Sequence, residues 1–159
     1  ADPARAGAAT SNAPTRLSLV AAPVDSSVSA APGALLSSWV VVVKGSPASL
    51  LGLQFTLIGS VNPDEVRDLK LTVNGVEATA LPTAPGGTEF FFWLGQNPVE
   101  LPRGFSTMQI TGDMSGSLSG RTVRLSLIKK YKVFAADAKH NKCITPMVDE
   151  RNQTTITLE

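Results

Sequence analysis

The sequence has little of what catalysis, metal binding and disulfide bonding require. Its one cysteine, Cys143, has no partner for a disulfide within the chain. Its one histidine, His140, stands three residues before Cys143, but a zinc site needs four ligands and is usually built from two such pairs. A catalytic triad needs a histidine base beside a nucleophile, and this histidine lies in a lysine-rich segment. We therefore predict no catalytic residue, no metal, no cofactor and no enzymatic activity.

Charge and long apolar runs are also scarce. Charged residues make up 17% of the chain and the net charge is +1, whereas a nucleic-acid-binding domain needs a concentrated basic face. The longest apolar run, residues 39–43, is much shorter than the roughly 18 residues that span a bilayer. We therefore expect no nucleic-acid partner and no membrane insertion.

The clearest signal that is present lies at residues 66–80, VRDLKLTVNGVEATA. Apolar and polar residues alternate on both sides of Asn74-Gly75, which is the strongest short-range signal for a β-hairpin. The side chains that this alternation places on the inner face of the first strand are Leu69, Leu71 and Val73.

Short alternating segments separated by Gly, Pro, Asn and Ser make up the rest of the chain. Beside the hairpin and a short strand near Val28, they occupy residues 16–21, 35–44, 51–57, 89–94, 105–111, 121–128, 130–135 and 153–159. Residues 137–148 look irregular, and no amphipathic helix is present. This pattern of eight to ten short, mostly antiparallel strands predicts an all-β domain, a sandwich or a barrel. We prefer a single Ig-like β-sandwich domain over residues 16–159, preceded by an extension at residues 1–15 that is either flexible or a donor strand.

The strand at residues 89–94, EFFFWL, is apolar on both faces. Alternation places Phe91 and Trp93 on one face and Phe90 and Phe92 on the other. Core packing, with one side covered by a loop or a partner, is the interpretation we prefer. The alternative is that Phe91 and Trp93 form an aromatic platform for the sugar rings of a surface glycan.

Two further features concern the segment from residue 129 onward. It holds a group of basic residues: Lys129, Lys130, Lys132, Lys139, His140 and Lys142. These residues bind an anionic polymer, bind the acidic tail of a neighbouring subunit or, as we prefer, face solvent at a strand edge.

Asn152 begins the one N-x-[ST] sequon in the chain, and it is a candidate glycosylation site.

The two ends of the predicted domain favour assembly. A strand with an open edge can accept a strand from a neighbouring copy, and a head-to-tail exchange of this kind produces a filament. The candidate interface residues are Leu17, Leu19 and Val20 in the first strand and Ile156 and Leu158 in the last. The alternative left open is that both strands pair within their own subunit.

Four segments carry a resemblance to a known family. They are VVVVKGSPASLLGLQFTL at 40–57, VRDLKLTVNGVE at 66–77, PVELPRGFSTMQITGDMS at 98–115 and RTVRLSLI at 121–128. Together they resemble the Ig-like β-sandwich modules of secreted bacterial surface and filament proteins, such as those of pili and surface layers. The resemblance is one of strand pattern, supplies no functional residues, and implies an extracellular structural role. LLGLQFTL at 50–57 also resembles cohesin modules, which implies a binding module.

These observations lead to one prediction of function and one alternative. We predict a secreted, non-enzymatic structural subunit of a cell-surface polymer that assembles head-to-tail with copies of itself by strand complementation. The start Ala1-Asp2-Pro3, which lacks a methionine and suits the position after a signal-peptidase site, favours secretion. The alternative is a monomeric secreted module that binds a glycan or a protein.

Overall fold

The computed structural model describes residues 14–82, 87–94, 98–127, 132–140, 142–149, 151 and 153–159. They form strands joined by turns, with two short 3-10 turns, η1 (Pro63–Glu65) and η2 (Gly116–Leu118). The strands are β1 (Arg16–Ala21), β2 (Ser27–Val28), β3 (Ala34–Lys44), β4 (Ala48–Gly59), β5 (Arg67–Val73), β6 (Val76–Pro82), β7 (Glu89–Trp93), β8 (Val99–Leu101), β9 (Gly104–Asp113), β10 (Thr122–Ser126), β11 (Val133–Asp137), β12 (Cys143–Ile144), β13 (Met147–Asp149) and β14 (Ile156–Leu158). The all-β class is confirmed.

The predicted count of eight to ten strands is too low. The structure describes fourteen strands, and β8, β12 and β13 are the ones without a counterpart in the prediction. β12 and the first two residues of β13 lie in the segment predicted to be irregular, residues 137–148. Each of the three has only two or three residues, which is too short for an alternating pattern to be recognised.

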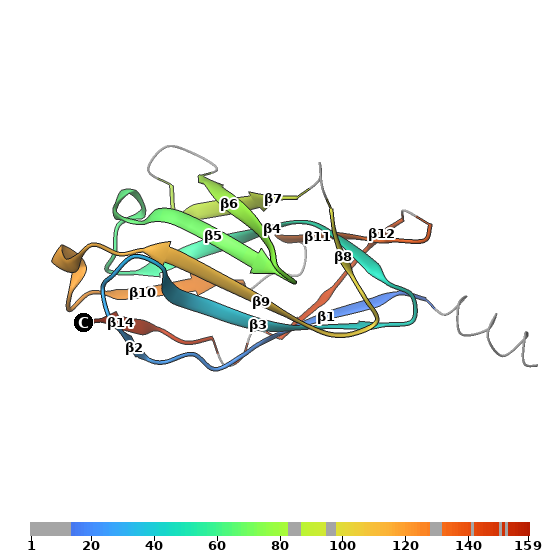
Figure 1. Ribbon diagram of the computed structural model, residues 1–159, viewed down its shortest axis with the longest axis horizontal. Coiled ribbons are helices and arrows are strands. Elements are labelled where there is room, and N and C mark those ends of the chain that lie inside the picture. The colour runs from blue at the N-terminus through green and yellow to red at the C-terminus, as the bar shows by residue number, and fades with distance from the viewer. Residues whose placement is uncertain are drawn as a thin grey trace, which may run out of the picture.

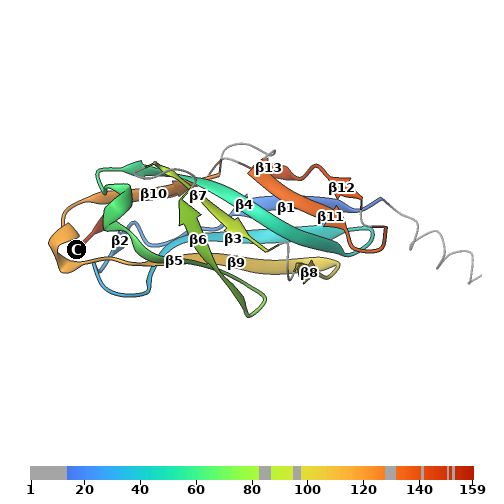
Figure 2. The ribbon, with the colours of Figure 1, turned by 90° about the horizontal axis from the view of Figure 1, so that it is seen from above.

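The strands form a strongly curled sheet that bends at β6. Their order is β13-β1-β3-β9-β5-β6-β7-β4-β10-β14-β2, with β11 and β8 also paired to β4 and β12 paired to β11. The first part of β6 pairs with β5, while its last three residues pair with β7. The sheet therefore returns over itself, and β3, β9 and β5 form one layer while β7, β4 and β10 form the other. β1 and β13 continue the first layer beyond β3 and curl toward the second (Figures 1 and 2). Among the described pairs, β1–β13 and β14–β2 are parallel and the others antiparallel.

The core lies between these two layers. Trp39 of β3 and Phe55 of β4 are fully buried, and their ring centroids are 6.4 Å apart across the layers. Phe55 also meets the edge of Phe92 of β7 at 6.0 Å and an interplanar angle of 81°. Edge-to-face contacts of this kind add to the free energy gained from burying the rings.

The predicted hairpin is confirmed. Asn74 and Gly75, at its turn, have φ values of 49° and 81°, as a type I′ turn requires at both central positions. The three residues expected on the inner face of β5 are buried: Leu69, Leu71 and Val73. The amide Nδ2 of Asn74 donates a hydrogen bond of 3.1 Å to Ser106 Oγ, which fastens the turn to β9.

Replacing Gly75 with alanine should lower the free energy of unfolding by about 1 kcal/mol, because an L side chain is strained at a positive φ. Gly116→Ala is the matched control, since Gly116 has no positive φ and no atom lies within 4 Å of the position its Cβ would take. Urea unfolding of both variants measures the difference. Equal midpoints would contradict the turn assignment.

Both terminal strands pair within the chain. β1 pairs along its whole length with β3 and, through three residues, with β13. Leu17 and Leu19 of β1 are 2% and 1% exposed, and Ile156 and Leu158 of β14 are buried as well. In this structure of a single chain, the two strands therefore adopt the alternative named above, in which both pair within their own subunit. Residues 1–13 of the predicted extension lie outside the described residues, and in the described part no helix is long and apolar enough to cross a membrane.

Candidate functional site

The outer face of β7, β4 and β11 carries a cluster of exposed aromatic side chains. β4 lies between the other two strands (Figure 1). Gly52 of β4 is paired with Trp93 of β7 on one side and with Phe134 of β11 on the other. Residues paired across antiparallel strands point to the same face of a sheet, so the two aromatic side chains flank the glycine.

Phe91 joins these two rings into one surface. Its ring centroid is 5.9 Å from that of Trp93, with the planes 22° apart, and 5.7 Å from that of Phe134. Leu81 of β6 is the direct cross-strand partner of Phe91 and is 61% exposed. Trp93 is 53% and Phe134 41% exposed. We call the surface formed by Leu81, Phe91, Trp93 and Phe134 the aromatic platform.

The platform follows from strand alternation in β7 and from the glycine beneath it. Phe90 and Phe92 point into the core, so Phe91 and Trp93 must point outward. A Cβ atom on Gly52 would lie 3.1 Å from Cζ of Phe91 and 3.4 Å from Cε3 of Trp93. The rings therefore lie over β4 where only glycine leaves room for them.

Polar groups border the platform on its β4 and β7 side. Gln54, half-buried, is paired with Phe91, and Thr56 is paired with Glu89. The carboxylate of Glu89 lies 3.6 Å from the ammonium group of Lys132. The surface thus combines apolar ring faces with an amide, a hydroxyl and an ion pair, and these groups can hold a ligand in a defined direction by hydrogen bonds.

Sequence reasoning located half of this platform. It placed Phe91 and Trp93 on a common face, although core packing was preferred for the segment, and the structure brings the two rings together on the outside. It missed Phe134, Leu81 and Gly52, because their proximity depends on the register of strands far apart in the sequence. The glycine in the middle of a strand was an available signal, since such glycines mark close approaches.

Comparison with known proteins adds no family assignment. No protein-family model matches the chain, and no curated protein matches it. The solved structure titled "AvmM Catalyzes Macrocyclization in Alchivemycin A Biosynthesis" is 14% identical, with a TM-score of 0.41 over 91% of this chain and 88% of that chain. A similarity of this degree supports no conclusion about fold or activity.

The proposed assembly residues do not lie on the aromatic platform. Leu17, Leu19, Ile156 and Leu158 are core residues of terminal strands, as described above. Val20 is 36% exposed and lies on the outer face of the opposite layer. Asn152, the candidate glycosylation site, lies outside the described residues.

The described residues of the basic segment do not form one cluster. Lys129 and Lys130 lie outside the described residues, and Lys132 faces Glu89. In the β11–β12 turn, Nδ1 of His140 lies 3.1 Å from Oδ2 of Asp137. This hydrogen bond and one from the backbone N–H of Lys139 lower the pKa of the Asp137 carboxyl group.

A second carboxylate is held by an arginine beside β13. The guanidinium group of Arg151 donates hydrogen bonds of 3.0 and 2.9 Å to the two carboxylate oxygens of Asp149. These bonds lower the pKa of Asp149 to about 2. Arg151 is exposed and Asp149 is half-buried, and their charges cancel, so neither group is free to bind an ion. In the described part of the chain, no three His, Cys, Asp or Glu side chains are close enough together to hold a metal.

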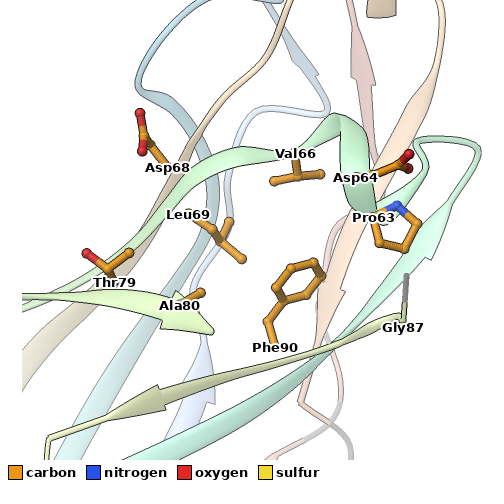
Figure 3. A pocket seen from close by; sticks show the side chains of 9 residues that line it. All are labelled: Pro63, Asp64, Val66, Asp68, Leu69, Thr79, Ala80, Gly87 and Phe90. Carbon is orange, nitrogen blue, oxygen red and sulfur yellow. The ribbon is translucent and has the colours of Figure 1, made fainter. Parts of the chain in front are cut away.

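A cavity of about 420 Å³ lies where β6 leaves β5 and joins β7. Val66, Leu69 and Phe90 line it, and the carboxylates of Asp64 and Asp68 at its rim point away from it (Figure 3). Binding pockets usually combine apolar walls with a few convergent polar groups. This cavity lacks such groups among its described lining residues, so we do not take it as the site.

Proposed function

We propose that the protein is a non-catalytic binding module that holds a polysaccharide chain on the aromatic platform. The observation that carries this proposal is the exposure of Trp93, Phe134 and Leu81 around Phe91 on one sheet face. Exposed apolar clusters on a folded protein mark interaction sites, because water contact with them costs free energy. The negative face of an aromatic ring attracts the polarised C–H groups of a pyranose ring.

The core of the domain does not require these rings. Phe90, Phe92 and Phe55 already fill the space between the layers, while Trp93 leaves more than half of its surface in water. The row of ring faces over β4 suits an extended chain of sugars, and Gln54 and Thr56 beside it offer hydrogen-bonding groups for the hydroxyls. A shallow open surface of this kind supports binding and offers no acid–base pair for hydrolysis.

The test is affinity electrophoresis in gels that contain neutral or acidic polysaccharides, followed by calorimetry with the one that retards the protein. Trp93→Ala should weaken binding at least about tenfold, which corresponds to about 1.4 kcal/mol. Phe105→Ala is the matched control, because Phe105 is 80% exposed on the opposite layer and should leave binding unchanged. Unaltered binding by the Trp93 variant, or no retardation by any polysaccharide, would contradict the proposal.

A second candidate function is the structural one, a secreted subunit of a cell-surface polymer built from an Ig-like sandwich. The observation that favours it is the pairing of β1, which lies at the start of the domain and contacts β3 over all six residues. A β1 strand from a neighbouring copy would make the same hydrogen bonds and bury Leu17 and Leu19 equally. The two facing layers, joined by the Trp39–Phe55 contact, support the sandwich.

Light scattering and negative-stain microscopy separate the two candidates. Reducing buffer is needed, since exposed Cys143 could otherwise link two copies. A monomer of 16.6 kDa supports the binding module, whereas long fibres that persist in reducing buffer support exchange of β1 between copies.

A further inference from the structure

Three cations lie in a row on the outer face of the layer opposite the aromatic platform. Arg16 of β1 is directly opposite Lys44 of β3, and Arg103 immediately precedes Gly104, the partner of Val43. All three are exposed, and the ion pairs among the described residues involve other cations. Like charges on directly opposed residues repel each other, so this arrangement is unfavourable without an anion.

Exposed apolar side chains occupy the next row of the same face. Met147, Ser18, Val42 and Phe105 follow one another across β13, β1, β3 and β9 in direct register. Phe105 is 80% and Met147 71% exposed, and the two are separated by three strand spacings, about 14 Å. Val20 adds a third exposed apolar side chain in the row beyond.

The surface is hollowed beside each protruding side chain. A groove of about 530 Å³ lies among Lys44, Arg103, Phe105 and Val42, so that charged groups and apolar groups line the same depression. A second one, of about 550 Å³, runs along Val20 and Met147 and ends at the Asp149–Arg151 ion pair. Two cations thus stand directly beside an apolar groove, and the one described carboxylate of the second depression is already neutralised.

We propose that this basic–apolar face docks on a bilayer that contains anionic phospholipid. It comprises Arg16, Lys44, Arg103, Val20, Val42, Phe105 and Met147. The cations contact headgroup phosphates, while Phe105 and Met147 enter the boundary between headgroups and acyl chains. Basic side chains beside exposed apolar ones are what anionic membrane surfaces attract.

The three cations and the exposed Phe105 and Met147 favour an anionic bilayer over two other partners. An anionic polymer would satisfy the three cations and leave Phe105 and Met147 in water. A second copy placed face to face would bring two cationic rows into one interface, where like charges disfavour association. An anionic bilayer offers phosphates to the cations and an apolar boundary to Phe105 and Met147.

Further charged residues of both signs lie at the end of the molecule where the three cations lie. The backbone N–H of Ala138 donates a hydrogen bond of 3.1 Å to the carbonyl of Pro47, so the β11–β12 turn lies beside the β3–β4 turn (Figure 1). This brings the exposed Lys139 and Lys142 to the same end. Asp137 and the exposed Glu100 lie at this end too, through their pairing with Ala48 and Ser49. The positive potential that would orient the face toward anionic lipid therefore comes from Arg16, Lys44 and Arg103.

The experiment is co-sedimentation with vesicles of phosphatidylcholine alone or of phosphatidylcholine and phosphatidylglycerol in equal amounts. We expect binding to the second only, with loss in about 1 M salt, where charges are screened within a few ångströms. Lys44→Glu should weaken binding at least about fivefold, and Phe105→Ser should weaken it at low salt. The controls are Lys70→Glu, which makes the same change in net charge at another exposed lysine, and Trp93→Ser on the opposite layer.

Several outcomes would overturn the proposal. Equal binding to both vesicles, or equal loss in the two lysine variants, would show that the face does not recognise anionic lipid. Binding to soluble dextran sulfate that Phe105→Ser leaves intact, without vesicle binding, would assign the cations to an anionic polymer. A dimer in lipid-free solution that Phe105→Ser dissociates would assign the face to a second copy. Because Trp93→Ser removes only polysaccharide binding, failure of either proposal leaves the other testable.

Discussion

Replacing Phe92 with alanine is expected to lower the free energy of unfolding by about 3–5 kcal/mol. The ring is fully buried and packs edge-on against Phe55 at 6.0 Å. Its backbone pairs with Leu53 of β4 and Ala80 of β6, at the point where β6 passes from one layer to the other. Alanine would leave a cavity at this bend, and domains of ordinary stability have only about 5–15 kcal/mol in total. The midpoint and slope of urea unfolding measure the loss.

The control is the next residue along the same strand. Trp93→Ala removes a larger side chain, but one that is 53% exposed, so the change in stability should stay within about 1 kcal/mol. The same variant should lose polysaccharide binding. If it instead destabilised the fold as much as Phe92→Ala, the outer rings would serve the stability of the sheet, and the platform would not be free to bind.

The period of two along each strand could be read from the sequence, and it predicted much of this arrangement. The hairpin around Asn74-Gly75 and the division of β7 into an inner and an outer face both follow from local alternation and turn chemistry. Local alternation did not show which strands pair with each other. Phe134 meets Phe91 because β11 and β7 both pair with β4, and that pairing depends on contacts far apart in the chain.

At the edge of the first layer, too, the pairing of strands could not be predicted from the sequence. The first two residues of β13 lie in the segment that looks irregular in sequence, because this strand forms through its parallel pairing with β1, a contact far apart in the chain. Arg16, Lys44 and Arg103 are isolated cations along the chain. The register of β1 with β3 places the first two opposite each other, and the turn before β9 brings Arg103 to the groove beside Lys44. Local patterns specify which way a side chain points, whereas the register decides which side chains meet.

Replacing Gly52 with alanine should lower the free energy of unfolding by about 1–3 kcal/mol. A Cβ there would lie 2.8 Å from the carbonyl oxygen of Phe92 and 3.1 Å from Cζ of Phe91. The first atom belongs to the backbone of a paired strand and cannot turn aside, so β4 and β7 must separate or shift. The rings of Phe91 and Trp93 would be displaced with them, which predicts weaker polysaccharide binding and an altered near-ultraviolet circular dichroism spectrum.

Gly112→Ala is the matched control, because Gly112 is also inside a strand and has no positive φ. Its Cβ would approach only the ends of flexible side chains, Cδ1 of Leu36 at 3.1 Å and Cδ1 of Leu69 at 3.3 Å. These can move slightly, and alanine also restricts the unfolded chain, so the net change should be within about 1 kcal/mol and polysaccharide binding should be retained. Equal effects of the two substitutions on stability and binding would mean that the aromatic rings do not depend on the space above Gly52.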